Sequence, residues 1–553
     1  MPSTDPTNRS GWKVSACIFA MVLAGLSLRA VLAVLAEHQL DCDESTVALM
    51  SLDILEQGAR PMFFYGGSYN GGAAFEAYLG ALVIALFGFS PVGFKLILAL
   101  IWAAGALIFA DLCRRHLPPA QAIAAVAFLC LGTPFFLEWS TTARGGFAET
   151  FFFSALLLWL AGAPDHWRLR NPAARSTAFA PSDSVASVAP SAPFASFASF
   201  ASFGFAAGLS LWASEMILPL LPLAGAWLFF SVSSQYRLRA LALGLCAFAI
   251  GLIPLAAYNA AHQWQHLRES ALAALFATGS APLSAAQLLA SAHFVLGWGG
   301  WLLLAAAALA ATRIALHRRP VTLSHVLLAH ALLYGLGYWL SGLRFLELPP
   351  SRVLYPLQLN LAVLAASALD PQFRSALGTR WRALPAATLF LWVGLTAFAL
   401  IQWGASGEPR ARGSWRASWC LVDGEGLRDA LGRRGVKVVF VNYWTATPLA
   451  LANRVAARRD PGASPVVASN RLPENPRPGQ SAAVALPEDS PLLARFEQSL
   501  RRQGTPYDRW RWGPYAILSG LDATHLRPGD LDLPALLEEG SKPPAPRPPD
   551  GFN

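Results

Sequence analysis

Apolar stretches of about 20 residues, divided by short polar segments, recur from residue 14 to residue 403. A transmembrane helix needs about 20 apolar residues to cross a hydrocarbon core of about 30 Å. The pattern therefore predicts an all-α polytopic membrane domain over residues 1–403, with about 11 transmembrane helices. The first run, 14–36, is too long for a cleavable signal peptide, so we predict an uncleaved first helix.

The pattern changes after residue 403. Residues 404–540 are more polar, rich in Arg, Pro and Gly, and long enough for a small domain. Strand-like runs alternate there with helix-like segments, which predicts a small C-terminal α/β domain. The predicted strands are 436–441, 465–469, 481–486 and 515–518, with a helix at 492–503. The Pro-rich residues 541–553 are predicted to be a disordered tail.

The composition supports the membrane assignment. Hydrophobic residues make up 54% of the chain and charged residues 14%, which is more apolar surface than a soluble domain could bury. A net charge of +9 could suggest a nucleic-acid partner. However, the Lys and Arg residues lie mostly in short loops between apolar stretches, which is a topology signal. We therefore expect no nucleic-acid partner.

Placing the basic loops in the cytoplasm gives a consistent path for the chain. The N-terminus is cytoplasmic, and the first helix leads outward into a long external loop, 37–91. The next helix returns inward and ends at Arg114 and Arg115. A second large external loop spans 258–290, and the C-terminal domain emerges on the extracytoplasmic side. We thus predict an integral protein of a bacterial inner or plasma membrane.

The apolar stretch 73–89 is left out of this count. Treating it as a span would invert every later loop and place the Arg clusters outside, and it contains Glu76. We predict a juxtamembrane or re-entrant helix on the outer surface.

The first external loop holds the candidate chemistry. It opens with Asp41, Asp43 and Glu44, for which a charged helix cap is the alternative interpretation. A loop rich in Gly, Tyr and Asn follows at 65–72, in which backbone and hydroxyl donors could approach a ligand closely. Cys42 also lies here; together with Cys420 it would be extracytoplasmic, where the two form a disulfide or stay as free thiols.

Three motifs occur in order along the membrane domain. They are the Asp43-Glu44 pair, followed by Gly58, Pro61, the Tyr-Gly loop with Glu76 and Phe87-Gly88; then Arg144-Gly145-Gly146-Phe147-Ala148-Glu149; and then Arg352-Val353-Leu354-Tyr355-Pro356-Leu357. On these motifs the chain resembles the GT-C superfamily of integral membrane glycosyltransferases. The similar branch contains the protein O-mannosyltransferases of glycosyltransferase family 39 and the lipid A aminoarabinose transferases.

The sequence departs from the family pattern at three points. Val353 stands where the family often has Tyr, and Asp41 is an additional acid before the usual pair. The Glu-Lys-Pro-Pro motif of the aminoarabinose enzymes has no match.

The resemblance implies a glycosyltransferase that takes a sugar from a polyprenyl-phosphate donor. Transfer is inverting, occurs at the extracytoplasmic face without a glycosyl-enzyme, and delivers the sugar to an envelope lipid, glycan or protein. An acceptor hydroxyl has a high pKa and needs a carboxylate base; we assign Asp43, with Asp41 as the alternative. Glu44 orients a basic residue or caps a helix.

Donor binding is assigned to residues that share the predicted outer surface. The departing lipid phosphate calls for Arg, although interfacial snorkelling is the alternative for each arginine. The set is Glu44, Tyr65, Tyr69, Asn70, Glu76, Arg144, Arg344 and Arg352.

No metal site or cofactor is predicted, and a divalent metal is an open alternative. His262 and His266 have the spacing of a helical zinc pair, but a third ligand is missing, so we predict a surface helix. Two other functions remain as alternatives: a transporter or flippase of a lipid-linked glycan, and a non-catalytic GT-C relative. Transporters tend to have inverted repeats, and we detect none.

Overall fold

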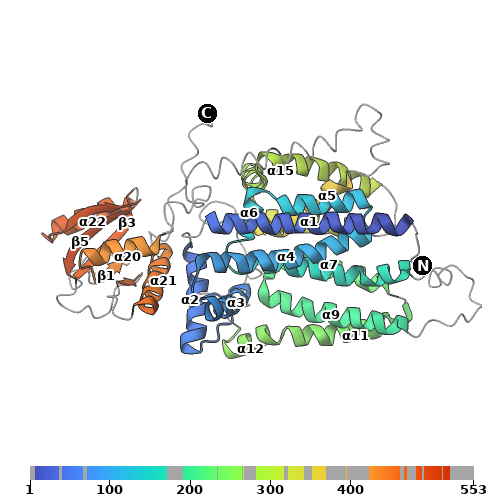
Figure 1. Ribbon diagram of the computed structural model, residues 1–553, viewed down its shortest axis with the longest axis horizontal. Helices are drawn as coiled ribbons and strands as arrows, with labels where there is room; N and C mark the ends of the chain where they lie inside the picture. The colour runs from blue at the N-terminus through green and yellow to red at the C-terminus, as the bar shows by residue number, and fades with distance from the viewer. Residues whose placement is uncertain are drawn as a thin grey trace, which may run out of the picture. The chain divides into compact units, whose positions relative to one another are not determined.

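The structure is a computed structural model (Figure 1). It describes residues 6–35, 40–65, 71–170, 191–232, 234–264, 266, 282–316, 322–341, 351–368, 394, 423–441, 443–460, 466–469, 481–488, 491–513 and 515–522. Several predictions fall outside these residues, namely those for Tyr69, Asn70, Arg344, Cys420 and the tail 541–553.

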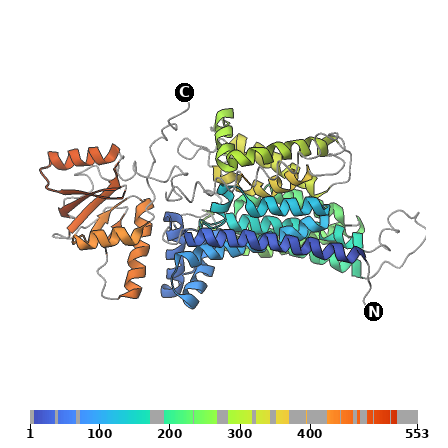
Figure 2. The same ribbon diagram turned by 45° about the horizontal axis from the view of Figure 1, so that its top comes forward.

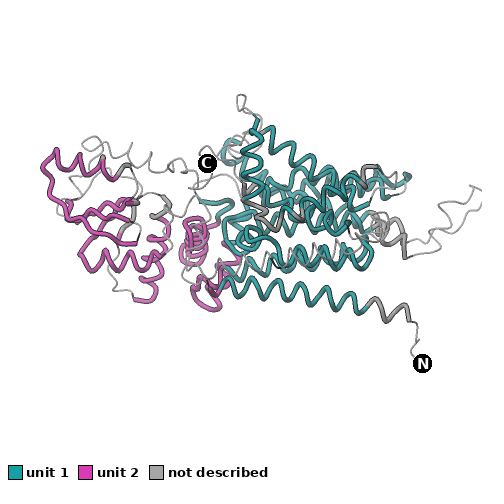
Figure 3. Tube along the Cα trace, turned by 90° about the horizontal axis from the view of Figure 1, so that it is seen from above, with its two compact units in different colours: residues 1–33, 61–76, 95–402 teal, residues 34–60, 77–94, 403–553 magenta. Residues whose placement is uncertain are grey.

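By compactness the chain divides into two units (Figure 3). Unit 1 comprises residues 1–33, 61–76 and 95–402, and unit 2 comprises residues 34–60, 77–94 and 403–553. Unit 2 thus joins segments of the predicted first external loop to the C-terminal residues. This grouping was not predicted from the sequence.

Unit 1 is helical. Helices α1, α4, α7, α9 and α11 run alongside one another (Figure 1). The elements are α1 (Pro6–Leu35), α4 (Pro91–His116, from Lys95 on), α5 (Pro119–Leu131), α6 (Pro134–Trp139), α7 (Phe147–Arg170), α9 (Ser191–Ala213), η1 (Glu215–Ile217), α10 (Leu220–Ser231), α11 (Ser234–Gly251), α12 (Ile253–Ala261), α15 (Ala285–Leu316), α16 (Leu323–Ser341), η2 (Ser351–Leu357) and α17 (Gln358–Ser367).

Helix length and composition make this an integral membrane protein. Among the described residues, three helices are long and apolar enough to cross a membrane: Trp12–Leu35, Pro91–His116 and Leu323–Leu340. A fourth is the pair α11 and α12, if the two helices, bent by 50°, form one span. Other apolar helices have 10–17 described residues. A total of about 11 spans stays a prediction.

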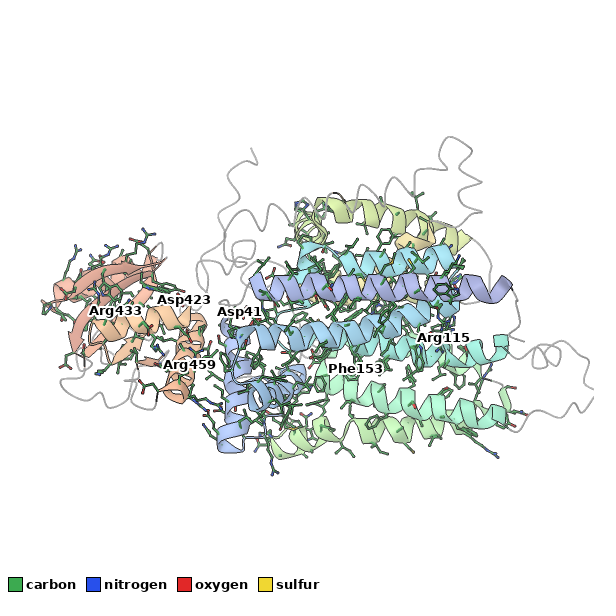
Figure 4. The ribbon with its side chains drawn as sticks, viewed as in Figure 1. Asp41, Arg115, Phe153, Asp423, Arg433 and Arg459 are labelled. Carbon is green, nitrogen blue, oxygen red and sulfur yellow. The ribbon has the colours of Figure 1, made fainter. Side chains whose placement is uncertain are left out.

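The C-terminal end of α4 is joined to α7 by a hydrogen bond and a cation–π contact. Arg114 and Arg115 lie in the last turn, where cations interact favourably with the helix dipole. Asp111 pairs with both of them, at 2.6 Å to Arg114, and accepts a hydrogen bond from Trp159 Nε1 at 2.8 Å. The guanidinium of Arg115, which Figure 4 labels, lies over the Trp159 ring at 4.9 Å from its centroid. This end, predicted to be cytoplasmic, is thereby fixed to α7.

Helices α9 and α11 approach each other closely because glycines form their contact. A Cβ atom added at Gly208 would overlap the Phe248 carbonyl oxygen and lie 2.8 Å from the Leu252 amide nitrogen. Gly204 and Gly251 also face backbone carbonyls of the other helix. Small residues allow such close packing where lipid provides no hydrophobic drive for helix association.

Unit 2 contains two helices of the predicted external loop. Helix α2 spans Cys42–Gln57, and α3 spans Gly71–Phe87, of which residues from Ala77 on belong to unit 2. Helix α3 is the stretch predicted as juxtamembrane or re-entrant. It exposes Leu82 and Leu86 on one face.

The C-terminal part of unit 2 is an α/β domain (Figure 2). Its five-stranded sheet has the order β2-β1-β3-β5-β4, with β1 parallel to β2 and β3, and β5 antiparallel to β3 and β4. The elements are α20 (Gly424–Arg433), β1 (Val438–Phe440), α21 (Tyr443–Arg459), β2 (Val467–Ser469), β3 (Ser481–Pro487), α22 (Pro491–Arg502), β4 (Asp508–Trp512) and β5 (Tyr515–Asp522).

Successive side chains along the strands point to opposite faces of the sheet, and each face forms a hydrophobic core. In β1, Val438 and Phe440 pack with apolar side chains of α22, and Val439 packs with those of α20 and α21. Four strands and α22 match the sequence prediction. Strand β4 was missed, because its Arg509 and Arg511 alternate with Trp510 and Trp512 and hide the apolar face.

We expect Gly208→Ala to destabilise the membrane domain. Gly to Ala in a helix interior is otherwise favourable by up to about 1 kcal/mol. At Gly208 the new methyl group must push α9 from α11, costing about 1–3 kcal/mol. Gly335→Ala is the matched control, since a Cβ there meets no described atom within 4 Å. Thermal denaturation midpoints in detergent should fall for Gly208→Ala only; equal midpoints would contradict the packing argument.

Candidate active site

Asp41, which Figure 4 labels, is the N-cap of helix α2 and forms a capping box with Glu44. Asp41 Oδ1 accepts a hydrogen bond from the Glu44 amide at 2.9 Å, and Glu44 Oε2 accepts one from the Asp41 amide at 3.2 Å. Both side chains are buried. The exchange satisfies backbone donors that the first helical turn leaves without intrahelical partners. Two of the three acids in the motif therefore stabilise the helix start.

Asp43 is the acid of the three that the capping box does not use. It lies in the first turn of α2 and is partly exposed. Its Oδ1 atom lies 3.8 Å from Cys42 Sγ. A carboxylate in the first turn of a helix interacts favourably with the helix dipole. Of the two acids that the sequence left as alternatives for the base, Asp43 is the more exposed.

Asp41, Cys42 and Asp43 together offer ligand atoms within 4.8 Å of one another. Magnesium and calcium sites are built from oxygen ligands. A buried thiol and an aspartate already used as a helix cap make a poor set for these ions. The prediction of no metal stays a prediction.

The start of α3 packs closely against the turn at Arg144-Gly145-Gly146, within unit 1. Gly145 and Gly146 have φ of 74° and 81°, which favours glycine. A Cβ at Gly145 would lie 2.6 Å from Ala73 Cβ, and one at Gly72 would overlap the Gly146 amide nitrogen. The glycines of both motifs are therefore required for two backbone segments to meet.

Glu76 supports the same turn. Its side chain is 1% exposed, and its Oε2 atom accepts a hydrogen bond from the Gly145 amide at 3.1 Å. The Glu149 carboxyl group, also 1% exposed, adjoins that of Glu76. Glu76 of the first motif and Glu149 of the second thus lie buried side by side in unit 1, at the turn that follows Arg144.

The second and third motifs meet through aromatic rings. The Arg144 guanidinium lies 4.3 Å from the Trp139 ring centroid, Trp139 packs edge-to-face on Phe147 at 4.4 Å, and Phe147 packs on Tyr355 at 5.6 Å. Tyr355 is fully buried. The late motif therefore helps to fix the turn that carries Arg144. The side chain of Arg352 lies outside the described residues.

Two buried cations were missed in the sequence. Arg29 in α1 is fully buried; its Nε atom donates to Ser140 Oγ at 2.7 Å, and its guanidinium lies 3.4 Å from the centroid of the Trp102 ring. Lys95 in α4 is 1% exposed. A charged residue within an apolar helix is by itself a signal of function or tight pairing, and it could have identified both.

Tyr65 is the remaining predicted donor-binding residue whose side chain the structure describes. It is 38% exposed at the end of the segment 61–65 of unit 1. A ligand could therefore reach its ring and hydroxyl.

The two histidines with the spacing of a zinc pair have different contacts. Helix α12 ends at Ala261, and His262 Nδ1 lies 2.9 Å from the Tyr258 carbonyl oxygen. His266 is buried; its ring stacks on Phe63, and its Nε2 atom lies 3.2 Å from Glu215 Oε1. The prediction of one surface helix through both residues is wrong, because the backbone turns at Gln263 and Trp264 with φ of 52° and 63°.

We expect Gly145→Ala to destabilise the protein by more than the backbone strain of an alanine with positive φ would. Gly58→Ala is the control, since Gly58 also has positive φ but a Cβ there meets no described atom within 4 Å. Both changes carry strain of about 1–3 kcal/mol. Gly145→Ala adds the overlap with Ala73, about 1–3 kcal/mol more. The thermal midpoint in detergent should drop further for Gly145→Ala; a larger drop for Gly58→Ala would refute the close packing.

No protein-family model and no curated protein matches the chain. Solved structures do. ArnT from Cupriavidus metallidurans bound to undecaprenyl phosphate is 14% identical and covers 91% of this chain and 98% of its own, with a TM-score of 0.53. Its apo state gives 13% identity, 93% and 99% coverage, and a TM-score of 0.54. The chain therefore has the fold of ArnT, the GT-C fold that its motifs led us to expect.

Proposed function

We propose that the protein is an inverting glycosyltransferase. It moves a sugar from a polyprenyl-phosphate-linked donor to an envelope acceptor on the extracytoplasmic face. The observation that carries this proposal is the fold shared with ArnT, which has been solved with undecaprenyl phosphate, over nearly the whole chain. The partly exposed Asp43 at the start of α2 supplies the carboxylate base that such chemistry needs.

Asp43 acts as the general base in this proposal. The acceptor hydroxyl oxygen attacks the anomeric carbon of the donor sugar and forms the new glycosidic bond. Its proton passes to the Asp43 carboxylate, and the bond between the anomeric carbon and the phosphate oxygen breaks. The lipid phosphate leaves with the electron pair. Attack from the side opposite the leaving group inverts the anomeric centre.

Arg144 stabilises the departing phosphate. Its guanidinium face lies on Trp139, and the N–H donors of a stacked guanidinium point outward in its plane. Charge-assisted, bidentate hydrogen bonds to phosphate are the strongest that a side chain offers. As the family resemblance implies, Arg344 and Arg352 also stabilise the negative charge on the departing phosphate. Tyr65, Tyr69 and Asn70 contact the donor. Glu44 and Glu76 act through α2 and the Arg144 turn respectively.

The active site faces the extracytoplasmic side. The basic last turn of α4 supports this orientation, since Lys and Arg accumulate on the cytoplasmic side. The N-terminus is then cytoplasmic and the α/β domain extracytoplasmic.

We expect Asp43→Asn to lower transfer by about 100-fold or more, the usual contribution of a general base. Asp41→Asn is the matched control, because Asn caps a helix as well as Asp; transfer should stay within about threefold of wild type. Envelope glycans are measured by mass spectrometry in a deletion strain carrying each variant, with protein level checked. Unchanged glycans with Asp43→Asn would rule out the proposed reaction.

Sidedness is tested with single cysteines in a background lacking the six native ones. Gln57→Cys lies on the exposed end of α2, and Ala120→Cys is exposed at the start of α5. A membrane-impermeant maleimide should label only Gln57→Cys in intact spheroplasts, and both after permeabilisation. Labelling of Ala120→Cys alone in intact cells would place Asp43 in the cytoplasm and end the proposal.

A further inference from the structure

Within unit 2, helix α21 of the α/β domain packs along α2 (Figure 4). Thr447 Oγ1 donates a hydrogen bond to the Cys42 carbonyl oxygen at 3.1 Å, beside Asp43. Farther along, Arg454 pairs with Asp53 at 3.0 Å and also with Glu56. Polar contacts thus join the two helices at both ends of α2.

The α21 side of this contact is packed into the core of the α/β domain. Leu449 and Ala446 are buried in the core face shared with β1 and α20. A Cβ at Gly424 of α20 would overlap the Pro448 carbonyl oxygen, so α20 lies directly against the backbone next to Thr447. The domain core therefore sets where Thr447 lies.

The charges across the contact are complementary. Arg454 is 31% exposed, with Asp53 at 16% and Glu56 at 32%. Partial burial acts against the charged guanidinium, but its hydrogen bonds to Glu56 and Asp53 outweigh this and raise the pKa of Arg454. Two carboxylates one helical turn apart thus hold one arginine.

We propose that the α/β domain is a clamp on α2, in which Thr447 and Arg454 are positioning residues that hold the first turn of α2 and hence Asp43. This role rests on the proposed function, in which Asp43 is the base. It gives the C-terminal domain a task in the reaction without any contact to substrate.

The contact of α21 with α2, called docking below, is measured without any substrate. The measurement is hydrogen–deuterium exchange at residues 40–58 of the full-length protein in detergent. We expect Arg454→Glu to speed exchange there about tenfold, because like charges then face each other across the contact. Arg459→Glu is the matched control on the same helix, since Arg459 pairs with Glu425 of the α/β domain. Equal exchange in the two variants would overturn the clamp.

A charge-swapped variant separates docking from unfolding of the domain. Adding Asp53→Arg to Arg454→Glu restores an opposite-charge pair and leaves Glu56 with its second partner, Arg458, at 3.4 Å. Protection of 40–58 should then return to within about threefold of wild type. Thr447→Val, which removes a single hydrogen bond, should speed exchange at 40–58 but not in β1 and β3. Protection that does not return in the swapped variant, or an unchanged rate in Thr447→Val, would count against the clamp.

Glycan transfer by the same variants connects docking to the reaction. We expect about a tenfold loss with Arg454→Glu, recovery in the charge-swapped variant and wild-type transfer with Arg459→Glu. If Asp43→Asn leaves glycans unchanged, the proposed function fails while the exchange result stands. If Asp43→Asn abolishes transfer but Arg454→Glu does not reduce it, the positioning role alone fails.

Discussion

Polar atoms inside a lipid-embedded helical body must find partners within the protein, because hydrocarbon offers none. In unit 1, contacts between helices supply many of these partners. Arg29 donates to Ser140 and to the carbonyl oxygens of Gly25 and Cys130, and Asn360 bonds to His330 and to the Leu327 carbonyl. In unit 2, Ser51 donates to the Ala77 carbonyl across α2 and α3. Polar side chains thus fix which helices meet.

The same constraint explains why the motifs are rich in glycine and acid. Gly145 must present its amide to Glu76 in a turn with positive φ, and no side chain fits between that turn and Ala73. Removing Glu76 would leave a buried amide donor without this acceptor, which is costly where water is absent. Glu76, which the family resemblance assigns to donor binding, therefore has a contact within the protein.

Local features of the sequence predicted more than distant ones. The cap at Asp41 was an explicit alternative, since its partner Glu44 lies three residues away, and the strand β1 was evident from its apolar run. The role of Arg29 was not predictable in the same way, because Ser140 lies 111 residues along the chain. The grouping of α2 with the α/β domain was hidden for the same reason, as Arg454 and Asp53 are 401 residues apart.

A general base has to be held in place by its surroundings and also has to be accessible to the acceptor. Neighbouring side chains divide these tasks at the start of α2. Asp41 and Glu44 are buried and fix the backbone of the first turn, and the carbonyl group of Cys42 accepts hydrogen bonds from Thr46 and Thr447. Asp43 takes no part in the capping box and is partly exposed, and it lies in a turn whose backbone is held by Asp41 and Glu44 within α2 and by Thr447 of α21. The additional acid in this sequence therefore strengthens the assignment of Asp43, because the acid that competes with it is committed to the helix.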